Sequence, residues 1–157
     1  MKFSILDFGK HEGKTIPEIL LSDPNWFFWA LDAGLFQQHG RQQEEAAELG
    51  YRARNIKLPR DNPEQWRVNY YTNRHGDYWG FIIQRTDVLP DSGFAFETEV
   101  LSLEYVTQLR PTDRAYYLHK IKSYLFGKGS RVTKTVAEQF FGDDSNFDFS
   151  KRPAKVA

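Results

Sequence analysis

Two glycines and two lysines are interleaved near the N-terminus, in the segment Gly9-Lys10-His11-Glu12-Gly13-Lys14. Glycine allows a backbone with φ > 0 or a close approach to a ligand, and a lysine ammonium donates to phosphate oxygens. A helix start, with free N–H groups that favour anions, is expected after Thr15. This pattern indicates phosphate contact through Lys10 and Lys14, with Gly9 and Gly13 shaping the loop. The alternative is a β-turn whose glycines serve geometry alone.

Several chemistries are excluded or left without a candidate. Only three residues separate Gly9 from Gly13, so the loop is not a Walker A motif and we expect no nucleotide hydrolysis there. The chain has no cysteine, which excludes disulfides, thiolate metal sites and a cysteine nucleophile. The histidines are isolated, and no serine lies in a Gly-x-Ser-x-Gly elbow. The sequence indicates no cofactor and favours a protein that is not an enzyme.

Basic residues are segregated by segment, although the formal net charge is zero. Residues 51–60 contain no acid, and residues 107–134 contain a single acid among many bases. Segregated charge can build a local basic face on a neutral protein. We therefore take these segments as the source of further candidate contacts to phosphate or to a partner, with an ordinary solvated surface as the alternative. The candidates are Arg52, Arg54, Arg114, Lys120 and Lys122.

An acidic stretch over residues 86–106 offers a weaker alternative. Asp91 follows a proline, and Glu97 and Glu99 lie two residues apart, on one face of a strand. Restriction-type nucleases combine Pro-Asp with Glu-x-Lys at a Mg²⁺ site. Here Glu99 stands where the lysine belongs, and the Pro-Asp lies too close in sequence. A metal site at Asp91, Glu97 and Glu99 is thus the least favoured interpretation, and we assign no metal.

The first elements are predicted from helix-start signals. Thr15 with Glu18 forms a capping box, and Asp23 followed by a proline starts a second helix that ends near Gly34. On that helix we expect Trp26, Trp29 and Ala30 to face inward, leaving one phenylalanine at the margin. Composition predicts a further helix over residues 41–56.

Later segments alternate in pattern and then change period. An antiparallel hairpin is predicted for residues 66–72 and 78–84, and another strand for 94–103. Two helices follow, one from Thr112 or Asp113 to Phe126 and one over residues 132–141. The predicted fold class is α+β, with a small Phe-Gly-Lys turn and helix module followed by a hairpin-based antiparallel sheet packed by two C-terminal helices.

Two prolines in residues 58–63 indicate an extended connection. We therefore expect a module over residues 1–58, a linker over 59–63, an α+β domain over 64–149, and a flexible basic tail over 150–157.

Residues 6–31 carry the pattern Phe-Gly-Lys, two further residues, Gly-Lys, an Ile/Leu-rich turn, then Asp23 and Trp29. This segment resembles the small module at the C-terminus of exodeoxyribonuclease X-type proteins, which also occurs in short bacterial proteins called quorum-sensing-regulated factors. The resemblance implies an accessory module associated with nucleic acid. Glu12 departs from it, because a lysine or arginine is usual there. The nuclease domain that precedes the module in that family is absent, so no exonuclease activity is implied.

These observations favour a non-enzymatic intracellular accessory protein that binds DNA, RNA or a nucleic-acid-processing partner. The main alternative is a protein-interaction adaptor that makes no contact with nucleic acid, and the third is a metal-dependent nuclease. No run of about 18 apolar residues occurs, and the first residues lack the apolar region of a signal peptide. We therefore expect no membrane association and a cytoplasmic location. The sequence does not indicate an oligomeric state.

Overall fold

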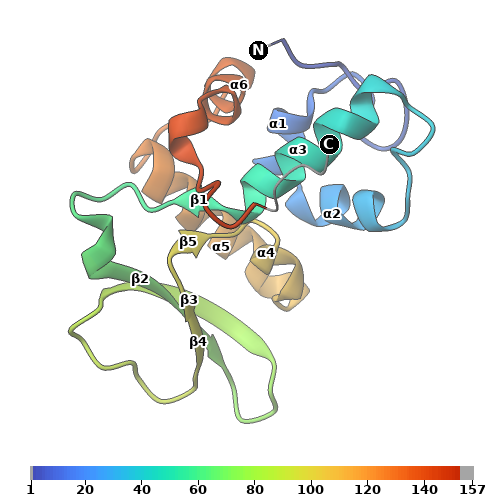
Figure 1. The fold of residues 1–157 in the computed structure, drawn as a ribbon. Helices are drawn as coiled ribbons and strands as arrows, with labels where there is room; N and C mark the ends of the chain where they lie inside the picture. Colours follow the sequence, from blue (N-terminus) through green and yellow to red (C-terminus); the bar gives the residue numbers. More distant parts are fainter. Residues whose placement is uncertain (1, 153–157) are drawn as a thin grey trace.

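A computed structural model describes residues 2–152 and shows a mixed α+β fold, as the sequence predicts (Figure 1). The helices are α1 (Ile16–Leu20), α2 (Pro24–Asp32), α3 (Arg41–Arg54), α4 (Tyr105–Gln108), α5 (Pro111–Phe126) and α6 (Lys134–Gly142), with 3-10 turns η1 (Pro63–Gln65) and η2 (Asp144–Asn146). The strands are β1 (Ile56–Lys57), β2 (Trp66–Thr72), β3 (Tyr78–Arg85), β4 (Phe94–Thr98) and β5 (Val100–Leu101). No described helix is long and apolar enough to cross a membrane.

The first two helices start at the predicted caps. The Glu18 carboxylate accepts a hydrogen bond from the Thr15 backbone N–H at 2.8 Å, which is the return bond of a capping box. The Asp23 carboxylate accepts from the Trp26 N–H at 3.2 Å and caps α2. Past the end of α2, Gly34 has φ +78°, the left-handed conformation typical after a helix C-terminus.

The inward face of α2 differs from the prediction. Phe27 and Phe28 are buried, whereas Trp29 is 57% exposed; Ala30 is buried as expected. The prediction for Trp29 was wrong because α2 is covered from more than one side. Phe27 packs against Gly50 of α3, and the guanidinium of Arg54, the last residue of the same helix, covers the Phe28 ring at 5.0 Å. Helix α2 also contacts α1 and α4, so more than one of its faces is buried.

The three-stranded sheet has the order β3-β2-β4, with every pair antiparallel. The β2–β3 hairpin is confirmed, and Tyr70 of β2 lies opposite Phe81 of β3. The strand predicted over residues 94–103 is divided. Its first part, β4, pairs with β2, and its second part, β5, pairs with β1 through Ile56 and Leu101. The chain turns between them, where the Thr98 hydroxyl donates to the Val100 carbonyl at 2.7 Å.

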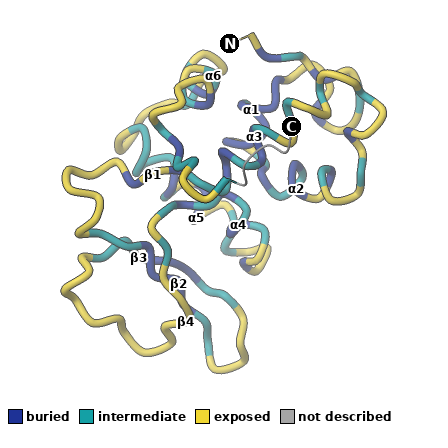
Figure 2. Tube along the Cα trace, in the orientation of Figure 1, coloured by how far each residue is buried: buried dark blue, intermediate teal, exposed yellow. Residues whose placement is uncertain are grey.

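The two edges of this sheet differ. On β3, the Tyr105 hydroxyl donates to the Gly80 carbonyl at 2.8 Å, and the Lys120 ammonium donates to the Phe81 carbonyl at 3.1 Å. A side chain on Gly80 would overlap the phenol ring of Tyr117. Helices α4 and α5 thus cover this edge. Strand β4 is mostly exposed along its length (Figure 2).

Helix α5 starts earlier than predicted. Arg110 is its N-cap and Pro111 its first residue, so Thr112 and Asp113 lie inside the first turn. Proline suits this position because its fixed φ is helical and it has no N–H to leave unpaired. Helix α6 follows a Thr133 cap and matches the predicted helix closely.

One buried cluster joins the N-terminal helices to the C-terminal segments. It includes Leu49 of α3, Leu101 of β5 and Phe141 of α6, and so takes side chains from both sides of the predicted linker. Within the connection, Leu58 is buried while residues 59–63 are exposed. The division into two modules stays a prediction.

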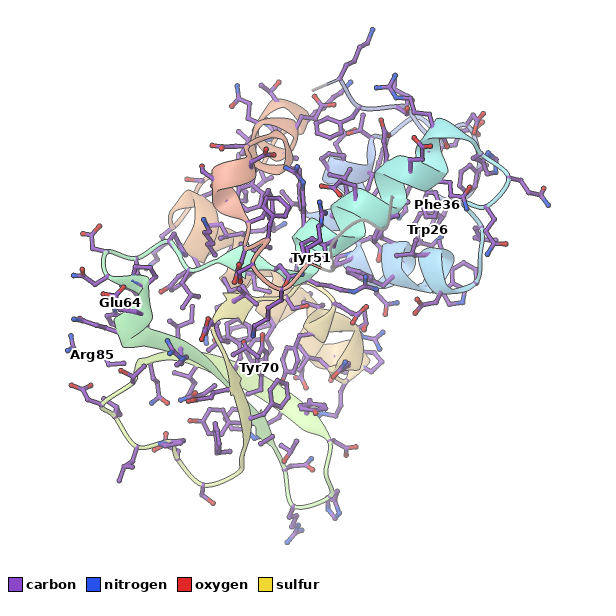
Figure 3. All side chains as sticks on the ribbon, viewed as in Figure 1. Trp26, Phe36, Tyr51, Glu64, Tyr70 and Arg85 are labelled. Atoms are coloured by element: carbon purple, nitrogen blue, oxygen red, sulfur yellow. The ribbon has the colours of Figure 1, made fainter. Side chains whose placement is uncertain are left out.

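The tail predicted over residues 150–157 is described only as far as Arg152, and residues 153–157 lie outside the described residues. The Arg152 guanidinium pairs with Glu48 and lies 4.4 Å from the ring centroid of Tyr51, which is labelled in Figure 3. Arg152 therefore packs against α3, whereas Ser150 and Lys151 are exposed.

Candidate functional site

The Gly9–Lys14 turn has a backbone that explains both of its glycines. Gly9 has φ +76° and Gly13 has φ +91°. The turn is closed by a bond from the Leu6 N–H to the Lys14 carbonyl (2.9 Å) and one from the Gly13 N–H to the Leu6 carbonyl (2.8 Å). A Cβ on Gly9 would lie 3.0 Å from Cζ2 of Trp26. The positive φ angles explain why both positions are glycine, and close packing against Trp26 is a second reason at Gly9. Neither reason involves a ligand.

Asp23 ties this turn to α2. Its carboxylate accepts hydrogen bonds from Lys10 Nζ at 3.2 Å, from His11 Nε2 at 2.9 Å and from the Trp26 N–H at 3.2 Å. Burial acts to raise the pKa of Asp23, but the bonds from His11, Trp26 and Lys10 and the Lys10 charge outweigh it, so the pKa lies below its usual value. Trp26 packs beside Phe36 in this part of the molecule (Figure 3). Lys10 is thus partly committed to an intramolecular ion pair.

Arg52, a candidate phosphate contact, lies in the interior. It is 5% exposed, and its guanidinium donates to the Phe141 carbonyl at 3.0 Å, to Asp144 at 2.7 Å and to Glu48 at 3.0 Å. Arg54, two residues on, forms an ion pair with Glu104 at 2.7 Å. Both arginines hold α3 to segments that are distant in sequence.

Two further candidates on α5 are also committed. Arg114 donates to the carbonyls of Leu109 and Thr107, each at 3.1 Å, and so satisfies the C-terminus of α4. Lys120 is half-buried over the rings of Phe81 and Tyr117, and desolvation lowers its pKa. These side chains are used to join α5 to α4 and to the sheet.

The structure brings the remaining two candidates together. Lys14 from the turn and Lys122 from α5 line one groove of about 180 Å³, and Lys134 at the start of α6 completes it. We call these three residues and the space between them the lysine groove. None of the three lysines forms an ion pair with any carboxylate in residues 2–152. Three positive charges from three separate elements therefore share one concave surface.

The other polar groups of the lysine groove are already satisfied. Glu18, its one acid, accepts from the Thr15 N–H and hydroxyl at 2.8 and 3.2 Å. The Ser22 hydroxyl donates to the Glu18 carbonyl at 2.8 Å, and the Thr133 hydroxyl accepts from the Val136 N–H. The groove thus offers ammonium donors, and its single carboxylate is held by the α1 cap.

Lys134 belongs to the basic segment over residues 107–134 but was not chosen as one of the candidate contacts. It is the first residue of α6 and lies next to the positive end of the helix dipole. A positive charge at this end destabilises the helix, whereas a negative charge stabilises it. A lysine directly after a threonine, a residue type favoured at N-caps, with no acid in the first turn, is the sequence signal that could have identified this position.

The acidic residues of the nuclease alternative lie around β4. Asp91 precedes the strand, Glu97 is exposed on it, and Glu99 follows it with a long ion pair of 3.8 Å to Arg67. Within the described residues, no three His, Asp or Glu side chains are grouped to hold a metal ion.

Comparisons with protein-family models, curated proteins and solved structures give no match to this chain. The resemblance of residues 6–31 to the exodeoxyribonuclease X C-terminal module therefore stays a prediction, and the chemistry of the site is argued from its geometry.

Proposed function

We propose that this protein is a non-enzymatic accessory protein that binds nucleic acid by its phosphate backbone, and that the lysine groove makes the contact. The observation that carries the proposal is the convergence of Lys14, Lys122 and Lys134 on one groove without a paired carboxylate. Clustered ammonium groups attract the regularly spaced charges of a phosphate backbone. The start of α6 adds backbone N–H groups and the positive end of a helix dipole.

The other basic candidates differ from the three lysines of the groove, and this difference supports the proposal. Arg52, Arg54, Arg114 and Lys120 make contacts inside the molecule, and their charges are used to join elements of the fold. Within residues 2–152, Lys14, Lys122 and Lys134 form no ion pair that joins elements of the fold. Lys134 in particular opposes the α6 dipole unless an anion lies nearby.

The experiment is a fluorescence anisotropy titration of a labelled oligonucleotide, single-stranded and duplex, with the parent protein and a triple variant, Lys14→Ala, Lys122→Ala and Lys134→Ala. We expect the triple variant to bind about 100-fold more weakly at about 0.1 M salt, since each phosphate contact contributes through counterion release. Circular dichroism should show an unchanged fold.

A matched control removes the same charge elsewhere. Lys2, Arg74 and Lys151 are exposed and are not among the residues that line the groove. Changing all three to alanine should leave most of the affinity. Equal weakening in both triple variants would contradict a localised site and indicate a general charge effect.

The adaptor alternative also has an observation in its favour. Strand β4 is an open edge with Phe94 and Phe96 each 39% exposed, and an extended segment of a partner protein can add to such an edge. Retention of full nucleic-acid affinity by the lysine-groove variant would favour this alternative.

A further inference from the structure

A large groove lies beside the connection between β1 and β2. It has a volume of about 980 Å³ and is bordered by residues 57–61, Pro63, Trp66, the end of α5, one face of α6 and η2. It is separate from the lysine groove, although α5 and α6 contribute to both. Its size falls in the range of sites that hold a small organic ligand or one unit of a polymer.

Arg60 is held in this groove by aromatic rings. Its guanidinium carbon lies 4.5 Å from the ring centroid of Trp66 and 5.0 Å from that of Tyr124, and its Nε donates to the Tyr124 hydroxyl. No carboxylate in residues 2–152 forms an ion pair with it. The two rings and the bond from Nε hold the guanidinium, and both of its terminal nitrogens are without a hydrogen-bond partner among these residues. The planar fork of a guanidinium matches the oxygens of a phosphate group.

The rest of the groove is suited to a flat polar ring. Phe126 and Phe140 lie edge to face, with centroids 5.3 Å apart, and both are partly exposed. Two amide side chains, Gln139 and Asn146, line the same space. Asn146 donates through Nδ2 to the Phe140 carbonyl, which leaves its Oδ1 as an acceptor. Aromatic surface beside amide groups is the combination that binds nucleobases.

We propose that this groove binds one nucleotide unit, with the phosphate on Arg60 and the base against Phe126 and Phe140. The unit is either a free nucleotide or one nucleotide of a single strand. In the second case the inference rests on the proposed function and extends it, because it adds base contact to the backbone contact at the lysine groove.

The experiment titrates adenosine monophosphate into the full chain by isothermal calorimetry. We expect saturable binding, and binding about tenfold weaker for adenosine and for inorganic phosphate, each of which lacks one half of the ligand. Arg60→Gln should weaken binding of adenosine monophosphate about tenfold, and Arg60→Lys should restore it only in part because lysine lacks the planar fork. A short single-stranded oligonucleotide that competes with adenosine monophosphate identifies a polymer as the source.

Arg85→Gln is the matched control, because Arg85 also lies over Trp66, at 5.9 Å, but does not line the groove. It should bind adenosine monophosphate like the parent. A thermal melt of each variant distinguishes a residue that contacts the ligand from one that only stabilises the fold. If Arg60 only stabilises the fold, Arg60→Gln should lower the melting temperature and leave the binding of adenosine monophosphate unchanged. That result, or the absence of saturable binding of adenosine monophosphate to the parent, would overturn the inference.

Failure of this inference can be told apart from failure of the proposed function. The lysine-groove triple variant should still bind adenosine monophosphate, whereas Arg60→Gln should keep salt-dependent binding to duplex DNA.

Discussion

Replacing Arg52 by methionine should destabilise the fold without affecting nucleic-acid binding through the lysine groove. The bond to the Phe141 carbonyl is buried, and leaving that acceptor unpaired costs about 1–3 kcal/mol. The partners Asp144 and Glu48 have side chains that are 78% and 33% exposed, so each of these pairs contributes at most about 1 kcal/mol. Glu48 also keeps its second partner, Arg152.

Methionine has a helix propensity similar to that of arginine and retains apolar contact with the rings around Arg52, which offsets part of this cost. The net cost is therefore about 2–3 kcal/mol. For a chain of this size, it lowers the melting temperature by about 5–10 °C.

Chemical denaturation in urea, followed by circular dichroism, measures this cost as a lower midpoint with an unchanged slope. Arg74→Met is the control, because Arg74 is exposed in the turn between β2 and β3 and forms no ion pair within residues 2–152. Its effect should stay within about 0.5 kcal/mol. A stability of Arg52→Met equal to that of the parent, combined with weakened oligonucleotide binding, would refute the structural role of Arg52.

Three further predictions concern the turn and the connection. The pKa of Asp23 is lowered in the fold, so the ionised carboxylate stabilises the fold at pH 7, and this stabilisation is lost as the pH falls below about 4. The loss of stability caused by Asp23→Asn should therefore shrink in acid, and a loss that stays constant down to about pH 2 would contradict this. Gly9→Ala should cost about 1 kcal/mol more than Gly13→Ala in urea denaturation, because both have φ > 0 but only Gly9 meets Trp26; equal costs would argue against close packing there. Limited digestion with subtilisin should cut residues 59–63 early, because they are exposed, and resistance at this connection with cutting elsewhere would count against a module boundary.

Features determined by neighbouring residues could be predicted from the sequence. The caps at Thr15 and Asp23 depend on side chains within three residues of the helix start, and both are present. The β2–β3 hairpin depends on alternation about a short turn, and it too is confirmed. In these cases the interactions that stabilise the element are local.

Pairings between distant segments could not be predicted in the same way. Strand β4 pairs with β2 rather than with β3, its neighbour in sequence, and no local pattern specifies that partner. The burial of Phe27 and Phe28 in place of Trp29 depends on α3, whose position is likewise set by tertiary packing.

The same limit separates structural from available charges. A basic run in the sequence does not reveal that the partner of Arg52, Asp144, lies 92 residues away. Lys14 and Lys122 are also far apart in sequence, and only the fold shows that they share a groove with Lys134. Residue type alone does not distinguish the basic candidates from one another, whereas packing identifies the two that meet in the groove.

The salt dependence of nucleic-acid binding tests the central claim most directly. The logarithm of the association constant for a duplex oligonucleotide is measured against the logarithm of salt concentration, for the parent and for the lysine-groove triple variant. If Lys14, Lys122 and Lys134 each neutralise one phosphate, the slope of the variant should be shallower by about 2–3, because each neutralised phosphate adds about 0.9 to the slope. An unchanged slope and affinity would contradict the assignment of the lysine groove as the site that binds nucleic acid.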